Sequence, residues 1–422
     1  MIDKITLPNG IRLIMEELPY LRSVSIGIWV LTGSSLENHT KSGISHFLEH
    51  MLFKGTEKRT AKQIVEELDS VGGDLQAFTS REFTCFSARV LDDHLLRAID
   101  VLHDIVVNSV LPEEEIQKEK GVVQEEIFMY EDTPGELIHD LYTSKIWQDH
   151  PLGLSILGTE HNVKNFTQDK LMEYYHKYYS SNNIVIAAAG NLKKENFISK
   201  TQEYFSSLGK QNIESDKTIP EAKSSINIYN KKLEQVHFCL GTHGLSFVHP
   251  SRYSLYLLNS IIGGSMSSRL FQSVREKHGL VYNIYSYQSS YSSAGVFSIY
   301  AGTAEKNFLK VIEIVLEELY KLKSEYLSEK ELRNVKEQLK GGITLSMESS
   351  ESRMGHLAKS EIYFNHYIAL EEIFKNIDEV KLEDILNLAK ELFQPKNITM
   401  VALGPVNDDI KDKIDRIIAE KL

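Results

Sequence analysis

The sequence contains His46-Phe47-Leu48-Glu49-His50, a stretch that puts two imidazoles and a carboxylate on one face of a predicted helix. Residues at i and i+4 lie one turn apart, so the rings of His46 and His50 can reach the same metal ion. Glu49, at i+3, lies where a hydrolytic metal site needs its general base. The order H-x-x-E-H is the inverse of the zinc-peptidase pattern H-E-x-x-H. The alternative is a surface helix that carries two ordinary histidines.

A third protein ligand is expected, because catalytic zinc sites usually combine three protein ligands with one open position. A helical pattern from about Pro112 to Asp132 contains Glu119-Lys-Gly-Val-Val-Gln-Glu-Glu126. Glu119 and Glu126 therefore lie two turns apart on one face of this helix. We expect Glu126 to complete a site for one Zn²⁺ per chain, and Glu119 to hydrogen-bond a ligand histidine and fix its tautomer. The alternative is the solvated charged face of an amphipathic helix.

These two segments together resemble the pitrilysin, insulysin and mitochondrial processing peptidase family of H-x-x-E-H metallopeptidases. Four further stretches resemble motifs of that family: Phe53-Lys-Gly-Thr56, Gly72-Gly-Asp-Leu-Gln-Ala-Phe-Thr-Ser-Arg-Glu-Phe-Thr84, Ser268-Arg-Leu-Phe271 and Arg275-Glu-Lys-His-Gly-Leu-Val-Tyr282. The matches run from about Asn9 to Pro405 and so cover almost the whole chain. The resemblance is to a short, single-half, bacterial-type member similar to processing peptidases.

The resemblance implies an α+β fold of two homologous αβ domains, each an antiparallel-rich mixed sheet packed against helices, forming half of a clamshell. It implies a zinc-dependent metalloendopeptidase that hydrolyses short or unfolded peptides inside a dimeric chamber, with a processing-type preference for basic residues. The competing class is a non-catalytic scaffold, or a peptide-binding partner subunit of a heterodimeric peptidase. Such relatives typically lose parts of the zinc motif, whereas this chain retains His46, Glu49, His50, Glu119 and Glu126.

Arg275 and Tyr282 are implied by the resemblance to hydrogen-bond the substrate carbonyl and the tetrahedral oxyanion. An arginine is always charged and a phenol donates without a charge, so both suit that task. A chain of 422 residues supplies one half of the clamshell. We therefore expect the pair to act in trans within a homodimer, with a heterodimer left open. The alternative is a helix-surface arginine and a core tyrosine.

Substrate contacts are expected at five positions. The strand around Gln76 and Ala77 could accept a peptide as an added edge strand, although the family usually has Asn where Gln76 stands. Phe53 could line the pocket for the residue after the cut or pack in the core. Glu136 and Asp140 lie where processing peptidases bind an arginine, whose planar fork two carboxylates can accept. The alternative is that a helix N-terminus simply favours acidic residues.

The chain shows an internal duplication. The stretch from Leu111 to Leu141 aligns without gaps with residues 327–357, an offset of 216, and residues 183–190 align with 397–404, an offset of 214. Two such similar offsets indicate a repeated fold. We predict a zinc-bearing domain at 1–212, a linker at 213–222 and a homologous domain at 223–422 that lacks metal ligands and carries the Arg/Tyr pair. Gly342 takes the place of Glu126 in the second copy, so the ligands are not a requirement of the fold.

The composition is ordinary for a globular protein, with 42% hydrophobic and 25% charged residues. The net charge of −12 argues against nucleic acid or an anionic membrane as a partner and fits a peptide substrate. No apolar run approaches the length of a membrane span, and the start lacks a secretory signal. Cys85 and Cys239 are predicted to be buried small hydrophobes in strands rather than a disulfide. We expect a cytoplasmic protein.

Overall fold

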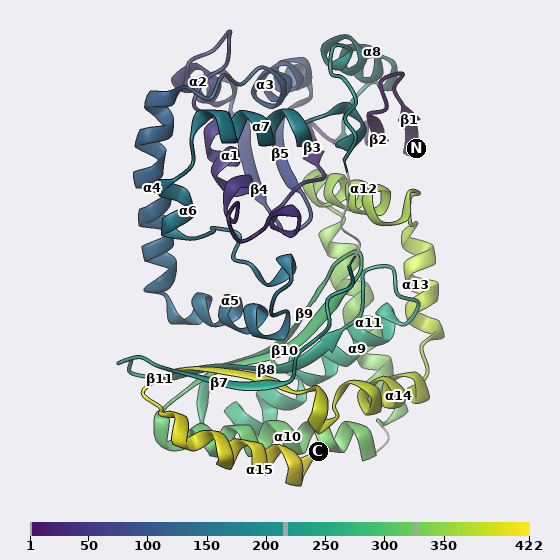
Figure 1. The fold of residues 1–422 in the computed structure, drawn as a ribbon. Helices are drawn as coiled ribbons and strands as arrows, with labels where there is room; N and C mark the ends of the chain where they lie inside the picture. The colour runs from purple at the N-terminus through teal and green to yellow at the C-terminus, as the bar shows by residue number, and fades with distance from the viewer. Residues whose placement is uncertain (1, 214–217, 325–326) are drawn as a thin grey trace. The chain divides into compact units, whose positions relative to one another are not determined.

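The computed structural model describes residues 2–213, 218–324 and 327–422. The chain forms two compact units, each a β-sheet packed against helices (Figure 1). Unit 1 comprises the described residues of 1–128, 154–216 and 344–367, and unit 2 those of 129–153, 217–343 and 368–422. The predicted fold class, with two mixed sheets packed on helices, is confirmed.

Unit 1 contains a six-stranded sheet in the order β1-β2-β6-β3-β5-β4. Its strands are β1 (Ile2–Thr6), β2 (Arg12–Glu17), β3 (Ser23–Val30), β4 (Asp74–Thr79), β5 (Thr84–Leu91) and β6 (Ile184–Gly190). The β2–β6 pair is parallel and the other pairs are antiparallel. Its helices are α1 (Ile44–Leu52), α2 (Ala61–Asp69), α3 (Leu95–Val107), most of α4 (Glu113–Glu131), α6 (Glu160–Lys164), α7 (Gln168–Tyr178), α8 (Lys194–Phe205) and α12 (Ser350–Phe364).

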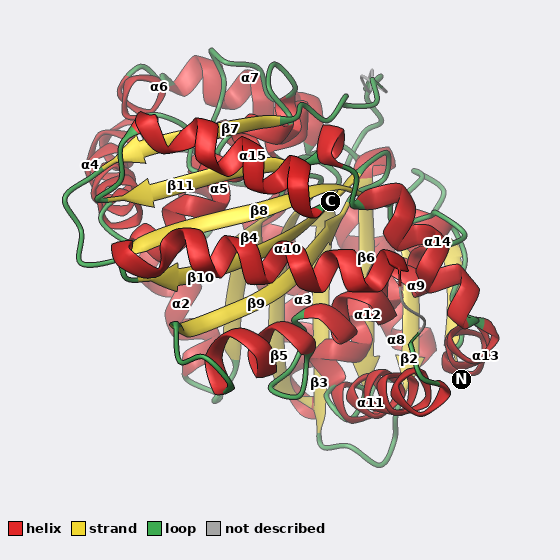
Figure 2. Cartoon of the chain, turned by 90° about the horizontal axis from the view of Figure 1, so that it is seen from below, coloured by secondary structure: helices red, strands yellow, loops and turns green. Residues whose placement is uncertain are grey.

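Unit 2 contains a five-stranded sheet in the order β7-β11-β8-β10-β9. Its strands are β7 (Ser225–Asn230), β8 (Val236–Gly244), β9 (Val281–Ser290), β10 (Gly295–Thr303) and β11 (Thr399–Gly404). Its helices are α5 (Pro134–Ile146), α9 (Arg252–Ile262), a π-helix (Phe271–Glu276), α10 (Phe308–Ser324), most of α11 (Glu329–Ser346), α13 (Leu370–Glu379), α14 (Leu382–Leu392) and α15 (Lys411–Lys421). Figure 2 shows α10 and α15 lying across one face of this sheet.

The two sheets repeat the same topology, which confirms the duplication. Strands β2-β6-β3-β5-β4 of unit 1 correspond in order to β7-β11-β8-β10-β9 of unit 2. The parallel pair stands in the same place in both, as β2 with β6 and as β7 with β11. The aligned segments form corresponding helices, α4 with α11 and α5 with α12.

Each unit includes one helix from the other half of the chain. Helix α5 packs against β8 and β11 of unit 2, where Ile138 and Tyr142 join the apolar cluster that contains Cys239. Helix α12 packs against β2, β3 and β6 of unit 1, where Met354 and Leu357 join a cluster around Trp29. The compact units therefore differ from the contiguous division predicted at 1–212 and 223–422, because an amphipathic helix can bury its apolar face on either sheet. Residues 214–217 of the predicted linker lie outside the described residues.

The remaining predictions about structure agree closely with the described elements. The strand predicted around Gln76 and Ala77 is β4, and the helix predicted from about Pro112 to Asp132 is α4. Cys85 lies in β5 and Cys239 in β8, and both are buried free thiols, as predicted. Among the described residues, no helix combines the length and the apolar character needed to cross a membrane.

Candidate metal centre

Helix α1 carries both motif histidines, and its apolar residues pack into the core of unit 1 and fix the position of the helix. Ile44, Phe47, Leu48 and Met51 follow helical spacing and are at most 1% exposed. The helix starts after Gly43, whose φ of 93° is readily reached by glycine. The buried carboxylate of Glu37 accepts hydrogen bonds from the backbone N–H groups of Gly43, at 2.7 Å, and Ser45, at 2.9 Å. An acceptor at this end satisfies free helical N–H groups.

His46, His50 and Glu126 bring three donor atoms together. Oε2 of Glu126, on α4, lies 3.6 Å from Nε2 of His46 and 3.5 Å from Nε2 of His50. Donors about 2.1 Å from one zinc ion in tetrahedral geometry lie about 3.4 Å apart. The two imidazoles and one carboxylate thus have the spacing and chemistry of a zinc site, and the partial exposure of Glu126 and His50 leaves room for a fourth ligand.

The electrostatics of His46 suit a metal ligand. Its side chain is 9% exposed, and burial lowers its pKa to about 3. Neutral imidazole is the form that binds metals, so His46 is ready to coordinate at neutral pH. Its Nδ1 atom has no hydrogen-bond partner among the residues that the structure describes.

Glu119 lies behind the ligands and orients His50. It is 3% exposed, and its Oε1 lies 2.8 Å from Nδ1 of His50. Because a carboxylate accepts, Nδ1–H of His50 donates, which leaves Nε2 free to face Glu126. Its Oε2 accepts from the ammonium of Lys54 at 2.7 Å. Burial alone would raise the pKa of Glu119, but the hydrogen bonds from His50 and Lys54 outweigh it and lower that pKa.

Glu49 lies beside the ligands on α1, as the motif predicts for a base. Its Oε2 accepts a hydrogen bond of 2.5 Å from the hydroxyl of Thr79, the last residue of β4. Burial raises the pKa of Glu49, and the hydrogen bond from Thr79 opposes that shift. Thr79 therefore holds one oxygen of the Glu49 carboxylate, and the other oxygen is available to a water molecule.

The predicted substrate residues of unit 1 lie at or near the edge strand β4. Gln76 is exposed and donates through Nε2 to Asp74 at 2.6 Å, so its side chain runs along the strand. Ala77 is half-buried and packs on the core. Phe53 is half-buried, with its ring centroid 6.2 Å from that of Phe86. Phe53 thus packs partly against the core of unit 1, and its predicted role in lining a substrate pocket stays a prediction.

Arg275 and Tyr282 form one local arrangement in unit 2. The Nη1 group of Arg275 donates to the backbone carbonyl of Tyr282 at 2.8 Å. The guanidinium lies between two rings, 4.7 Å from the centroid of Phe271 and 4.9 Å from that of Tyr282. The side chain of Tyr282 is 72% exposed, so its interpretation as a core tyrosine is wrong. Arg275 is fixed by stacking at a π-helix, an element frequent at functional sites.

Glu136 and Asp140 lie one turn apart near the start of α5 in unit 2, Glu136 exposed and Asp140 half-buried. Between them His139 contacts two phenols, those of Tyr287 at 2.8 Å and Tyr285 at 3.1 Å. Burial lowers the pKa of His139. The structure thus places both acidic residues on one face beside an aromatic cluster.

Comparison with known proteins identifies the family. Residues 12–160 match the family model described as insulinase, peptidase family M16, and residues 165–339 match the peptidase M16 inactive domain. The chain is 44% identical over 393 residues to a Bacillus subtilis protein named uncharacterized zinc protease YmxG, covering 93% of this chain and 96% of the relative. The chain belongs to peptidase family M16. It has the length of the single-half M16 proteins that it matches.

Other M16 relatives agree. An uncharacterized zinc protease of Streptomyces coelicolor is 34% identical over 426 residues, covering 99% of this chain and 93% of the relative. Two solved structures share the fold. A protease from Helicobacter pylori has a TM-score of 0.88 at 23% identity, covering 96% of this chain and 99% of that one. A peptidase M16 inactive domain from Pseudomonas fluorescens has a TM-score of 0.90 at 21% identity, covering 96% and 98%.

Sequence reasoning did not predict the contacts of Lys54 with Glu119, of Thr79 with Glu49 and of Phe271 with Arg275. Lys54, Thr79 and Phe271 lie within stretches that carry the family resemblance. Helical spacing could have indicated Phe271, which is four residues before Arg275. Nothing in the sequence pairs Lys54 with Glu119 or Thr79 with Glu49, because those contacts join separate elements.

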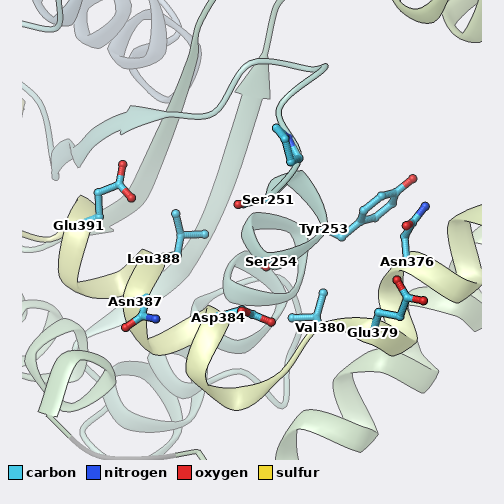
Figure 3. A pocket seen from close by; sticks show the side chains of 11 residues that line it. Ser251, Tyr253, Ser254, Asn376, Glu379, Val380, Asp384, Asn387, Leu388 and Glu391 are labelled. Atoms are coloured by element: carbon cyan, nitrogen blue, oxygen red, sulfur yellow. The ribbon is translucent and has the colours of Figure 1, made fainter.

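A pocket in unit 2 is unrelated to the predicted site (Figure 3). It lies between the start of α9, the end of α13 and helix α14, and three carboxylates line it, from Glu379, Asp384 and Glu391. None of the predicted M16 site residues is among its described lining residues.

Proposed function

We propose that this M16 protein is a zinc-dependent metalloendopeptidase whose metal is held by His46, His50 and Glu126. The observation that carries the proposal is the spacing of 3.5 and 3.6 Å between the Glu126 oxygen and the two histidine nitrogens, with Glu49 beside them. Relatives named zinc proteases over almost the full length support it.

In this mechanism each residue has a separate task. Zinc, when bound, polarises the scissile carbonyl and acidifies water. Glu49 takes the proton of the attacking water through its available oxygen and returns it to the leaving amine nitrogen. Glu119 keeps His50 in the tautomer that presents Nε2. The carboxylate of Glu49 can move protons while Thr79 retains its other oxygen.

The substrate that we propose is a short or unfolded peptide. Strand β4 lies at the edge of its sheet and can add an extended peptide by backbone hydrogen bonds, with Gln76 and Ala77 in contact with it. Glu136 and Asp140 supply two carboxylates for a basic side chain, which gives a processing-type preference.

We further propose that two chains form a homodimeric chamber in the cytoplasm, in which Arg275 and Tyr282 serve the metal site of the partner. The exposure of Tyr282 and the stacked guanidinium of Arg275 leave both with donors to offer a substrate oxygen. Mixing inactive E49Q with inactive Y282F chains should then restore part of the activity. Failure to complement, with chain exchange verified, would contradict sharing between subunits.

One experiment tests the function. Zinc-loaded protein is incubated with a mixed peptide library, with and without a chelator, and cut sites are mapped by mass spectrometry. We expect chelator-sensitive cleavage that is abolished in E49Q, which should still bind zinc, and that persists in the matched control E125Q. Absence of chelator-sensitive cleavage across diverse peptides would overturn the peptidase and favour the peptide-binding scaffold. Cleavage sites with a basic residue two or three positions before the cut would support the proposal that Glu136 and Asp140 bind a basic substrate side chain.

A further inference from the structure

The hydrogen bond between Thr79 and Glu49 joins two elements that are separate in the sequence. Glu49 is on helix α1 and Thr79 ends strand β4, and the two elements pack together in unit 1. The hydroxyl oxygen lies 2.5 Å from Oε2 of Glu49. An ionised carboxylate only accepts, so the hydroxyl is the donor. Among the described residues, this is the one side-chain hydrogen bond to Glu49.

A glutamate carboxylate needs such a partner to hold one orientation. The terminal torsion of a glutamate side chain is broad, and the half-buried Glu49 carboxylate would otherwise rotate. Fixing Oε2 leaves Oε1 as the oxygen available to a water. Catalysis is sensitive to such placement, since a misplacement of about 1 Å can cost roughly 10²-fold in rate.

The same strand also carries the proposed peptide-binding positions. Side chains alternate along a strand, so Ala77 and Thr79 share one face of β4 and Gln76 is on the other. Ala77 and Thr79 are half-buried toward α1, whereas Gln76 is exposed. A peptide that adds to the free edge of β4 would therefore bind the strand that holds the base.

We propose that Thr79 is a positioning residue that fixes the orientation of the Glu49 carboxylate. This proposal rests on the proposed function, because it takes Glu49 as the general base of the peptidase. The side-chain hydrogen bond of Thr79 goes to Glu49, so Thr79 would act through that carboxylate.

Two variants separate the hydroxyl from the rest of the side chain. T79V keeps the shape and removes the donor, and we expect kcat to fall roughly 10- to 100-fold, since bonds to charged groups have that weight, with KM within about twofold. T79S keeps the donor and should restore kcat to within about threefold of wild type. T84V removes a hydroxyl at the position paired with Thr79 on β5 and should leave kcat unchanged.

The proposal is overturned if T79V keeps kcat within threefold of wild type, or if T79S falls as far as T79V. A second readout needs no turnover: crystal structures of zinc-loaded T79V and T79S should show the Glu49 carboxylate displaced or disordered only in T79V. If wild type fails to cut peptides the proposed function fails, and this structural comparison still decides the role of Thr79.

Discussion

Replacing Glu119 by glutamine tests whether a buried carboxylate orients His50 for the metal. Glu119 is 3% exposed and satisfies two donors, Nδ1–H of His50 at 2.8 Å and Nζ of Lys54 at 2.7 Å. A glutamine has one acceptor oxygen, so E119Q can keep only one of these contacts. If the oxygen faces His50, the amide N–H groups face the ammonium of Lys54, and two donors oppose each other.

The expected magnitude follows from this loss. Partners of ligand histidines typically contribute about 10- to 100-fold in metal affinity, or about 1.4 to 2.8 kcal/mol. We expect E119Q to lie toward the upper end, because Glu119 carries a full charge that its two hydrogen bonds stabilise, as its lowered pKa indicates. Zinc affinity is measured near neutral pH by competition with a chromogenic chelator of known affinity. The control is E125Q, an exposed glutamate on the same helix. Zinc affinity of folded E119Q within twofold of wild type would refute the reasoning.

Three further predictions concern stability and the second unit. Burial lowers the pKa of His103, whose ring nitrogens have no hydrogen-bond partner among the described residues, so the unfolded chain binds the proton more readily and stability should fall as pH drops below about 6.5. The variant H103F keeps an aromatic ring beside Tyr204 and Phe205, and its Tm should depend less steeply on pH than that of wild type. Equal slopes of Tm against pH for the two proteins would contradict this. F271L should lower kcat/KM about 2- to 10-fold, because it removes one cation–π contact of Arg275, whereas F271Y keeps an aromatic ring and should leave kcat/KM unchanged. Equal kcat/KM values for F271L and F271Y would argue against a role of this contact. Removing zinc with a chelator should lower Tm but leave the far-ultraviolet circular dichroism spectrum unchanged, because the apolar core forms the fold and bound metal only adds to its stability. Loss of the helical signal would show that folding needs the metal.

Local sequence patterns predicted the elements of this fold well, because helices and strands follow from side-chain periodicity. The apolar positions of α1, at Ile44, Phe47, Leu48 and Met51, repeat with helical spacing, and all are buried. The same pattern says which face of α5 or α12 is apolar but not which sheet will cover it. The exchange of these two helices between the halves of the chain was therefore beyond reach of the sequence.

The site divides in a similar way. Helical spacing predicts that His46 and His50 can reach one metal ion. Glu126 lies on another helix, and it was expected as the third ligand because catalytic zinc sites usually have three protein ligands and because of the family resemblance. Lys54 and Thr79 carry no such signal, because a lysine or a threonine can donate to any nearby acceptor. Their roles depend on which elements pack together, and this becomes visible only in the folded chain.

The duplicated helix shows what the fold itself requires at these positions. With the offset of 216, Glu119 of α4 corresponds to Val335 of α11 and Glu126 to Gly342. Val335 is 9% exposed and belongs to the apolar core of unit 2, so the fold accepts a hydrophobic side chain where α4 buries a carboxylate. Burying a charge is costly unless it is paired, and an apolar residue would serve packing at least as well. The buried charge of Glu119 is therefore better explained by its hydrogen bond to His50 than by the stability of the helix.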